Sequence, residues 1–207
     1  MMEATARMVV SDLPVTEISA LEQELNALRR ELTLLKTANK ELERLVIRDT
    51  LTPLYNRRHF MNCLHERLNR LDRYEARTAL VFIDVNSMKQ INDCYGHSAG
   101  DAALIHIARL LASAVRATDV AARVGGDEFA LLLDGLDDAA MQETADQIEL
   151  LVAESECRFE GTLLPLSISV GWTCLRAGDS EFSALARADM AMYAAKRPGD
   201  SVVQAAE

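Results

Sequence analysis

The stretch Arg123-Val124-Gly125-Gly126-Asp127-Glu128-Phe129 decides the fold and the position of the candidate site. Residues 121–124 before the turn and 129–133 after it are apolar and short, which predicts two strands joined by a tight turn. We expect Gly125 and Gly126 to adopt the positive φ angles of a hairpin turn, because glycine has no Cβ atom. Acidic residues are disfavoured in strands. The adjacent carboxylates of Asp127 and Glu128 therefore indicate either a solvated turn or a functional site.

A second acidic strand end favours the functional interpretation. Residues 79–85 form a continuous apolar run that predicts a buried central strand, and Asp84 lies at its end. Residues 86–93 then show capping side chains and helical spacing, so a helix N-terminus should offer backbone N–H groups to phosphate, with Lys89 adding a positive charge. An ordinary strand-to-helix turn with an aspartate cap is the alternative. If the two acidic strand ends meet at one sheet edge, they form a divalent-metal site suited to phosphate chemistry.

The composition of the 207-residue chain limits the class of protein. The length suits one domain with an appendage. A net charge of −10 argues against electrostatic binding to nucleic acid or anionic lipid. The four cysteines are far apart, which predicts free thiols in a reducing cytoplasm. No apolar run approaches the length of a membrane span, and the N-terminus lacks the pattern of a secretion signal.

The N-terminal part of the chain predicts a coiled coil. Residues 1–14 show no sustained period and are expected to be disordered. Residues 15–48 carry a seam that alternates spacings of three and four, at Ile18, Leu21, Leu25, Leu28, Leu32, Leu35, Asn39, Leu42 and Val46. Asn39 at an a position selects a parallel, in-register homodimer, because the two amides pair with each other. A single amphipathic helix packed on its own domain is the alternative.

The rest of the chain, 49–207, predicts one domain. Pro53 cannot continue a helix and marks a hinge after the coil. Asn56 is expected to cap a helix that runs to about Tyr74. Further expected elements are a glycine-flanked loop at 96–101, helices at 102–116, 138–153 and 182–195, and strands at 163–172 and 201–204. This order predicts an α/β fold of the α+β type, with a mixed, mostly antiparallel sheet and helices packed on it.

Several short motifs follow one another in a specific order, from Asp49 to Val203. They are Asp49-x-Leu51-Thr52 with Asn56-Arg57-Arg58, Asp84-Val85-Asn86-x-x-Lys89-x-x-Asn92-Asp93, Gly96-His97-x-x-Gly100-Asp101, the turn at 125–129, Ser169-x-Gly171, and Ala188-Asp189 with Tyr193-x-x-Lys196. In these motifs the sequence resembles the GGDEF family, the diguanylate cyclases. The resemblance implies a palm-like fold that condenses two GTP molecules into cyclic di-GMP and two pyrophosphates. Each subunit of a dimer would hold one GTP, and the site would form where two domains face each other.

The resemblance also implies roles for individual residues. Two Mg²⁺ (or Mn²⁺) ions would bind Asp84, the carbonyl of Val85, Asp127 and Glu128. Asp127 would accept the proton of the attacking 3′-hydroxyl. Phosphate would be bound by the side chains of Lys89 and Lys196 and by the backbone N–H groups of Ser87 and Met88. Asn92 and Asp101 would recognise guanine, whose N1–H and 2-amino group suit a carboxylate, and His97 would line the guanine end.

By the same resemblance, Arg116 and Asp119 match an inhibitory site for the product, although the second arginine that often completes it is not evident near Gln147. Two further positions depart from the family pattern. Asp200 stands where many members have an arginine, which puts GTP affinity in doubt, and Pro53 replaces a glycine. The alternative hypothesis is therefore a weakly active or inactive module that binds GTP or cyclic di-GMP and signals through a partner. The sequence predicts no sensor domain, so the input signal is not identified.

Overall fold

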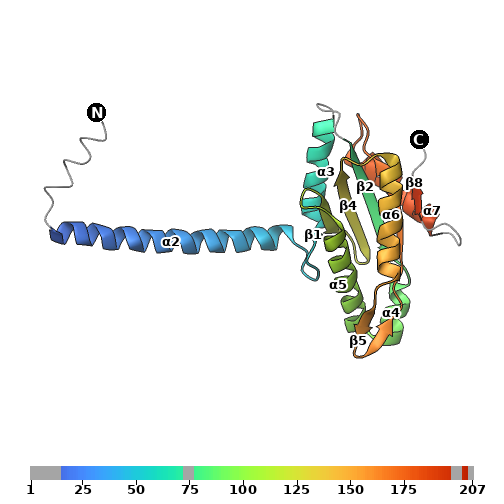
Figure 1. The fold of residues 1–207 in the computed structure, drawn as a ribbon, viewed down its shortest axis with the longest axis horizontal. Helices are drawn as coiled ribbons and strands as arrows, with labels where there is room; N and C mark the ends of the chain where they lie inside the picture. The colour runs from blue at the N-terminus through green and yellow to red at the C-terminus, as the bar shows by residue number, and fades with distance from the viewer. Residues whose placement is uncertain (1–14, 72–76, 197–201, 205–207) are drawn as a thin grey trace. The chain divides into compact units, whose positions relative to one another are not determined.

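A computed structural model describes residues 15–71, 77–196 and 202–204 (Figure 1). The chain divides into two compact units, Met1–Val46 and Ile47–Glu207. Residues Val15–Ile47 form one helix, α2, over the range in which the coiled coil was expected, and the coiled coil itself stays a prediction. The disorder expected for 1–14 lies outside the described residues. No helix of the described residues is both long enough and apolar enough to cross a bilayer.

The second unit is built on a six-stranded sheet. The central pairs β3–β4, β4–β2 and β2–β7 are antiparallel, and the outer pairs β1–β3 and β7–β8 are parallel. The mixed, mostly antiparallel sheet predicted from the sequence is therefore confirmed. In spatial order the strands are β1 (Tyr55–Asn56), β3 (Val120–Arg123), β4 (Glu128–Asp134), β2 (Thr78–Val85), β7 (Ile168–Cys174) and β8 (Val202–Gln204).

Helices cover both faces of this sheet. Alternate residues of a strand point to opposite faces, and in β2 Val81 and Ile83 join the core beneath α4, α5 and α6, whereas Leu80 joins the core beneath α3 and α7. Both layers flank the central strands in Figure 1. The helices are α3 (Arg57–Leu71), α4 (Met88–Tyr95), α5 (His97–Ala114), α6 (Asp138–Ala153) and α7 (Glu181–Ala195).

The segment between α2 and α3 folds around one carboxylate. Asp49 Oδ1 accepts hydrogen bonds from the N–H of Leu51 at 3.2 Å and from the N–H and hydroxyl of Thr52, both at 2.8 Å. Asn56 then accepts the N–H of His59 at 3.0 Å, which confirms the predicted cap of α3. The expected end of that helix near Tyr74 falls outside the described residues.

Two boundaries expected from the sequence are wrong. Residues 97–101 belong to α5 and do not form a loop, because Gly96 at φ 86° ends α4 and also starts α5. The single strand expected at 163–172 is two strands separated by Pro165, which has no N–H to donate to a ladder. The first, β6 (Thr162–Leu164), forms a hairpin with β5 (Cys157–Phe159), and the second is β7.

Helix α7 lies unusually close to the sheet. A Cβ atom on Gly171 of β7 would collide with the backbone of Met192 in α7. Only glycine allows this approach. The close packing fixes the C-terminal end of α7, and with it Lys196, beside the end of β2.

A glutamate from α6 completes the hydrogen bonding of β7. The N–H of Val170 donates to Glu149 Oε1 at 3.2 Å, and burial raises the pKa of this carboxyl from 4.5 to about 7. The folded protein therefore holds a proton between these pH values that the unfolded chain releases. The resulting contribution to stability is complete below about pH 4.5 and is lost as the pH rises through about 7.

We predict that Glu149→Gln will remove this pH dependence, because the amide cannot ionise. The melting temperature of the wild type should fall more between pH 5 and pH 8 than that of the variant, as measured by calorimetry. Glu154→Gln, an exposed change at the end of the same helix, serves as control. Parallel pH profiles for the wild type and Glu149→Gln would contradict the prediction.

Candidate active site

The site is organised by the register of β2 against its two neighbours. Asp84 lies directly opposite Glu128 of β4 and opposite Ser169 of β7. The ladder continues past Glu128, because the N–H of Val85 donates to the carbonyl of Asp127 at 3.0 Å. Directly opposed residues of an antiparallel pair place their Cβ atoms about 5 Å apart on one face. The two acidic strand ends predicted from the sequence therefore meet at one sheet edge.

Two arginines hold the turn that carries Asp127 and Glu128. Arg123 donates to the carbonyl of Gly126 from Nε at 3.1 Å and from a terminal nitrogen at 2.6 Å, and its other terminal nitrogen lies 3.3 Å from Asp49 Oδ1. Arg57 donates to the carbonyl of Val124 at 3.2 Å. These hydrogen bonds fix the backbone of the turn without using the carboxylates of the site.

Gly125 has a different role from the one expected. The positive φ angles predicted for Gly125 and Gly126 are wrong, because neither glycine is among the residues that adopt them. A Cβ atom on Gly125 would instead collide with the carboxylate of Glu128, whereas one on Gly126 would meet nothing within 4 Å. Gly125 therefore leaves space for the Glu128 side chain in the position that it adopts here.

The electrostatics of this edge favour a cation. Burial raises the pKa of Glu128, and the negative charges of Asp127, Asp84 and Asp189 raise it further, against the opposing charge of Arg57. We call Asp84, Asp127, Glu128 and Asp189 the carboxylate cluster. One cation is already close, since Lys196 Nζ lies 2.7 Å from Asp84 Oδ2.

The carboxylate cluster has the chemistry of a magnesium site but not a preformed geometry. Carboxylate and carbonyl oxygens are the ligands that Mg²⁺ and Mn²⁺ prefer, and the excess negative charge at Glu128 would be relieved by such an ion. Across the described residues, however, no group of three His, Cys, Asp or Glu side chains is already arranged around one metal position. The residues present therefore fit a divalent cation by their chemistry.

The start of α4 lies next to the cluster. Asn86 accepts the hydroxyl of Ser169 at 2.9 Å, and Ser87 adopts a left-handed conformation at φ 58° that directs the chain into the helix. The first turn of a helix leaves N–H groups without intrahelical acceptors, which fits the predicted role of Ser87 and Met88. Ser87 also borders a pocket of about 580 Å³ between α4 and residues 163–167. Lys89 is exposed on the same turn.

The predicted guanine-binding residues lie where α4 packs against α5. A Cβ atom on Gly100 would collide with the side-chain amide of Asn92, so this amide lies against the backbone that precedes Asp101. Asp101 is exposed on α5, and His97 is its exposed first residue. Asn92 and Asp101 are thus brought near each other by helix packing, while His97 lies one turn earlier.

Comparison with known proteins identifies the family. The family described as diguanylate cyclase, GGDEF domain, matches residues 46–201. The chain belongs to this family. It is 35% identical over 194 residues to the diguanylate cyclase TpbB of Pseudomonas aeruginosa, a match that covers 91% of this chain and 45% of TpbB. The chain thus spans about half the length of such curated relatives.

Solved structures of GGDEF proteins agree with this fold. The coiled coil and GGDEF domain of DgcB from Caulobacter crescentus, in complex with c-di-GMP, matches with a TM-score of 0.81 at 27% identity and covers 90% of this chain and 100% of that one. The diguanylate cyclase SiaD from Pseudomonas aeruginosa, in complex with its activator SiaC, matches with a TM-score of 0.76 at 32% identity, over 99% of this chain and 79% of that one.

Arg116 and Asp119 lie away from the carboxylate cluster of the GGDEF domain. They border a separate pocket of about 350 Å³ that also includes Arg48, Pro53 and Tyr55. The sequence indicates no role for Arg48, Asp189 or Glu149. Asp189 could have been found from its place in a family motif. The contact of Glu149 joins two separate elements, and Arg48 contacts residues of the following turn, so neither residue belongs to a periodic pattern.

We predict that Gly125→Ala will weaken divalent-cation binding by the GGDEF domain about tenfold, the lower end of the effect of disturbing the surroundings of a metal ligand. The added methyl group would displace the carboxylate of Glu128. Binding of Mn²⁺ in the presence of a non-hydrolysable GTP analogue, measured by electron paramagnetic resonance, tests this. Gly126→Ala is the matched control, since its methyl group enters open space, and equal affinities for the two variants would refute the role of Gly125.

Proposed function

We propose that this GGDEF domain is a diguanylate cyclase, which condenses two GTP molecules into cyclic di-GMP and two pyrophosphates. The observation that carries the proposal is the register that sets Asp84 opposite Glu128, beside a helix N-terminus. The names of relatives such as TpbB support it. GTP as substrate implies a cytoplasmic location.

One group of residues in this chain would bind GTP. Asp101 accepts hydrogen bonds from N1–H and the 2-amino group of guanine, which adenine does not offer, and Asn92 adds a further polar contact. The N–H groups of Ser87 and Met88 bind phosphate oxygens at the start of α4. Lys89 and Lys196 contribute positive charge to the triphosphate, and His97 lines the guanine end.

In each half-reaction the 3′-oxygen of one GTP forms a bond to the α-phosphorus of the other. The bond from this phosphorus to pyrophosphate breaks, and Asp127 accepts the proton of the hydroxyl. Asp84, Glu128, Asp127 and the carbonyl of Val85 would hold two Mg²⁺ or Mn²⁺ ions. Such ions, when bound, would supply Lewis-acid chemistry, which would lower the pKa of the attacking hydroxyl and offset the charge of the leaving group.

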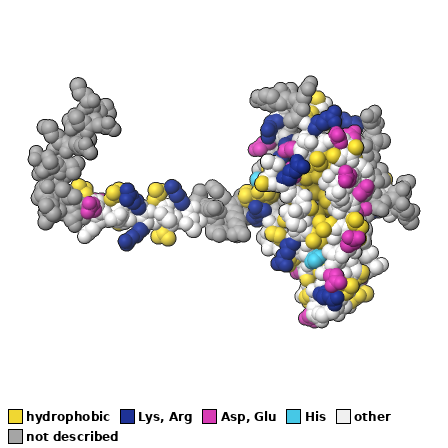
Figure 2. Space-filling model, in the orientation of Figure 1, with side chains coloured by type: hydrophobic (Ala, Val, Ile, Leu, Met, Phe, Trp, Pro, Cys, Tyr) yellow, Lys and Arg dark blue, Asp and Glu magenta, His cyan; other side chains and the backbone are white. Residues whose placement is uncertain are grey.

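The reaction needs two domains, and α2 offers the means to pair them. Its seam leucines are more than 45% exposed in the single chain: Leu21, Leu25, Leu28, Leu32, Leu35 and Leu42. Figure 2 shows apolar side chains along this helix among basic ones. An apolar stripe of two positions per heptad is typical of a coiled-coil seam. The proposed assembly is therefore a parallel homodimer, as the coiled coil present in the DgcB structure also suggests.

The activity test is incubation of the purified chain with GTP and Mg²⁺, followed by chromatography of the products. We expect cyclic di-GMP from the wild type and a loss of about 100-fold or more for Asp127→Ala, because proton transfer contributes at least this factor. Asp84→Asn should show a similar loss, and Glu156→Gln, an exposed change before β5 and outside the cluster, should show none.

Two results would contradict this proposal, one the role of Asp127 and the other catalysis itself. Product formation that is unchanged in Asp127→Ala would remove the proposed proton acceptor. Nucleotide binding without any turnover at high protein concentration would instead support a non-catalytic module. Asp200, which lies outside the described residues, favours this alternative by its place in the sequence.

We predict that Asn39→Ile will stabilise the coil but reduce the specific activity. An apolar a position no longer selects the in-register pair, so trimers and shifted pairs become accessible. Light scattering with size-exclusion chromatography measures the oligomer, and the GTP assay measures the activity. A variant that stays a dimer with unchanged activity would show that Asn39 does not specify the pairing.

A further inference from the structure

The pocket between α4 and residues 163–167 has the dimensions of a small-molecule site. Its volume is about 580 Å³, and such sites are mostly apolar with a few polar groups. Ile91 of α4 lines it together with Tyr95 and Leu163, which are 41% and 50% exposed. Figure 1 shows α4 and the β5–β6 hairpin beside each other at one end of this unit. A ligand in the pocket would therefore cover apolar surface that is in contact with water.

The pocket lies on the side of α4 that faces away from the proposed guanine site. Gln90 and Cys94, one helical turn apart, line it. Asn92 lies between them in the sequence, and its side chain leaves the helix about 200° away from each of theirs, against α5. Among the described residues, neither Asn92 nor Asp101 nor any member of the carboxylate cluster lines the pocket. The pocket and the proposed GTP site meet at the turn formed by residues 86–87.

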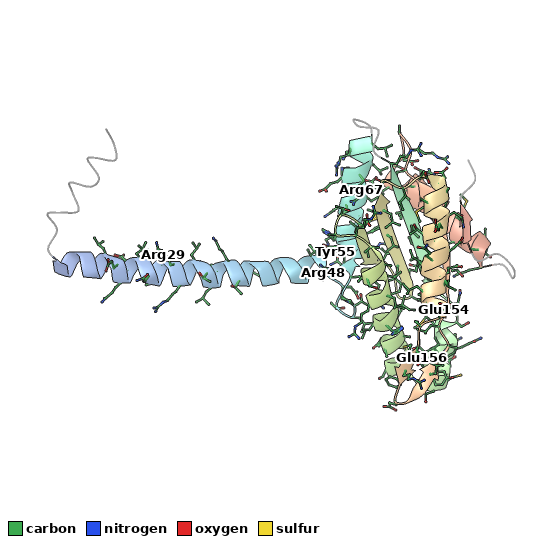
Figure 3. All side chains as sticks on the ribbon, viewed as in Figure 1. Arg29, Arg48, Tyr55, Arg67, Glu154 and Glu156 are labelled. Carbon is green, nitrogen blue, oxygen red and sulfur yellow. The ribbon has the colours of Figure 1, made fainter. Side chains whose placement is uncertain are left out.

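The walls of the pocket carry no charge. Within the part of the chain that the structure describes, no Asp, Glu, Lys, Arg or His side chain lines it, although 26% of all residues are charged. Two glutamates adjoin the lining residue Ser155, and Figure 3 shows Glu154 and Glu156 at the end of α6 and the start of the hairpin. Transfer of an ionised group from water to uncharged walls costs free energy, and the two glutamates would repel an anion in addition.

Polar groups on the walls are free to bind a ligand. The amide of Gln90 and the hydroxyl of Ser167 form no hydrogen bond with any other described residue. An amide and a hydroxyl each donate and accept hydrogen bonds. Both groups therefore suit the polar edge of a molecule whose apolar body lies against Leu163 and Tyr95.

We infer that this pocket binds an uncharged small molecule with an apolar ring and a polar edge, and that this ligand strengthens the binding of nucleotide. The first part is independent of the reaction that the domain catalyses. The second part rests on the proposed function, because it concerns the N–H groups of Ser87 and Met88 that are assigned to phosphate.

The turn at 86–87 provides the physical link between the two sites. Ser87 adopts φ 58°, a left-handed conformation that is uncommon for a residue with a Cβ atom. The N–H of Asn86 donates to the carbonyl of Ser167 at 2.9 Å, and all three residues line the pocket. A ligand packed against both segments stabilises this conformation of the turn. Nucleotide and ligand then favour the same state, so each raises the affinity of the other by the same factor.

Cys94 provides a reporter for the pocket. It is exposed and lines the pocket, whereas the other three cysteines are buried or half-buried. The probes are indole, which is neutral, and its relatives indoleacetate and tryptamine, which carry a negative and a positive charge. We expect indole to slow the reaction of Cys94 with a dithiobis-nitrobenzoate reagent. Each charged relative should need about tenfold more for equal protection, and Cys94→Ser gives the background rate.

Gln90→Glu tests the charge of the walls without changing their shape. The added carboxylate should weaken protection by indole about tenfold, because the ring would remove water from a charge, and it should make tryptamine the better of the two. Gln147→Glu is the matched control, the same change at an exposed position of α6 outside the pocket. Unchanged protection in Gln90→Glu, or equal protection by all three probes in the wild type, would overturn the assignment of an uncharged ligand to this pocket.

The link to nucleotide is measured with a non-hydrolysable GTP analogue. The analogue should raise the affinity for indole about fivefold or more, the usual lower limit of coupling between sites. Calorimetry should give the same factor for the effect of indole on the analogue, and both effects should shrink in Gln90→Glu. Protection that is independent of the analogue would overturn the coupling.

The outcomes separate this inference from the proposed catalysis. Absence of protection by indole near its solubility limit would overturn the inference even in a chain that converts GTP. Protection that depends on Gln90 in a chain that binds the analogue but converts no GTP would overturn the proposed catalysis and leave the inference standing.

Discussion

Two like charges placed directly opposite each other constrain this structure more than any other feature. An antiparallel ladder normally avoids such a pair, because like charges at opposed positions are destabilising. Here β2 and β4 are paired along seven residue pairs, from Thr78 opposite Asp134 to Asp84 opposite Glu128. The apolar residues of these strands fix the register, and a shift by one residue would move them to the wrong face. The apolar pairs along the rest of the ladder therefore offset the repulsion between Asp84 and Glu128.

The neighbouring groups respond to this charge. Lys196 reaches Asp84, and Arg57 lies close enough to Glu128 to oppose the rise of its pKa. Lys196 arrives there because Gly171 lets α7 approach β7 without an intervening side chain. The close packing of α7 thus places a positive group beside the repelling carboxylates. Substrate phosphates and metal ions would add their own charges at the same place.

Much of this arrangement could be predicted from local sequence. Apolar runs that end in Asp84 and begin after Glu128 locate the strands, and the heptad spacing locates α2. The predictions that were wrong concern two element boundaries, which depend on neighbouring segments. Gly96 ends one helix and starts the next, so α5 begins five residues before the expected position. The β5–β6 hairpin consists of strands too short to give a periodic signal.

The contribution of single residues was harder to predict than the fold. Gly125 was expected to adopt a positive φ angle, which is wrong, and the structure shows that it instead leaves space for the Glu128 side chain. Glu149 accepts a hydrogen bond from Val170 in another element, and Arg48 contacts Pro53 and Tyr55 across a turn. The assignment of metal, guanine and phosphate ligands came from the family resemblance. The structure shows that the acidic residues lie at the ends of β2 and β4, and that Asn92 lies where α4 packs against α5.

Arg123 joins two loops that are 77 positions apart in the chain. It contacts Asp49, which organises the segment just after α2, and it also donates twice to the carbonyl of Gly126, next to the acidic pair. One rigid planar group therefore serves both loops, and neither can shift alone without giving up part of its hydrogen bonding. A displacement of Asp49 would therefore be transmitted through a single side chain, that of Arg123, to the turn that carries Asp127 and Glu128.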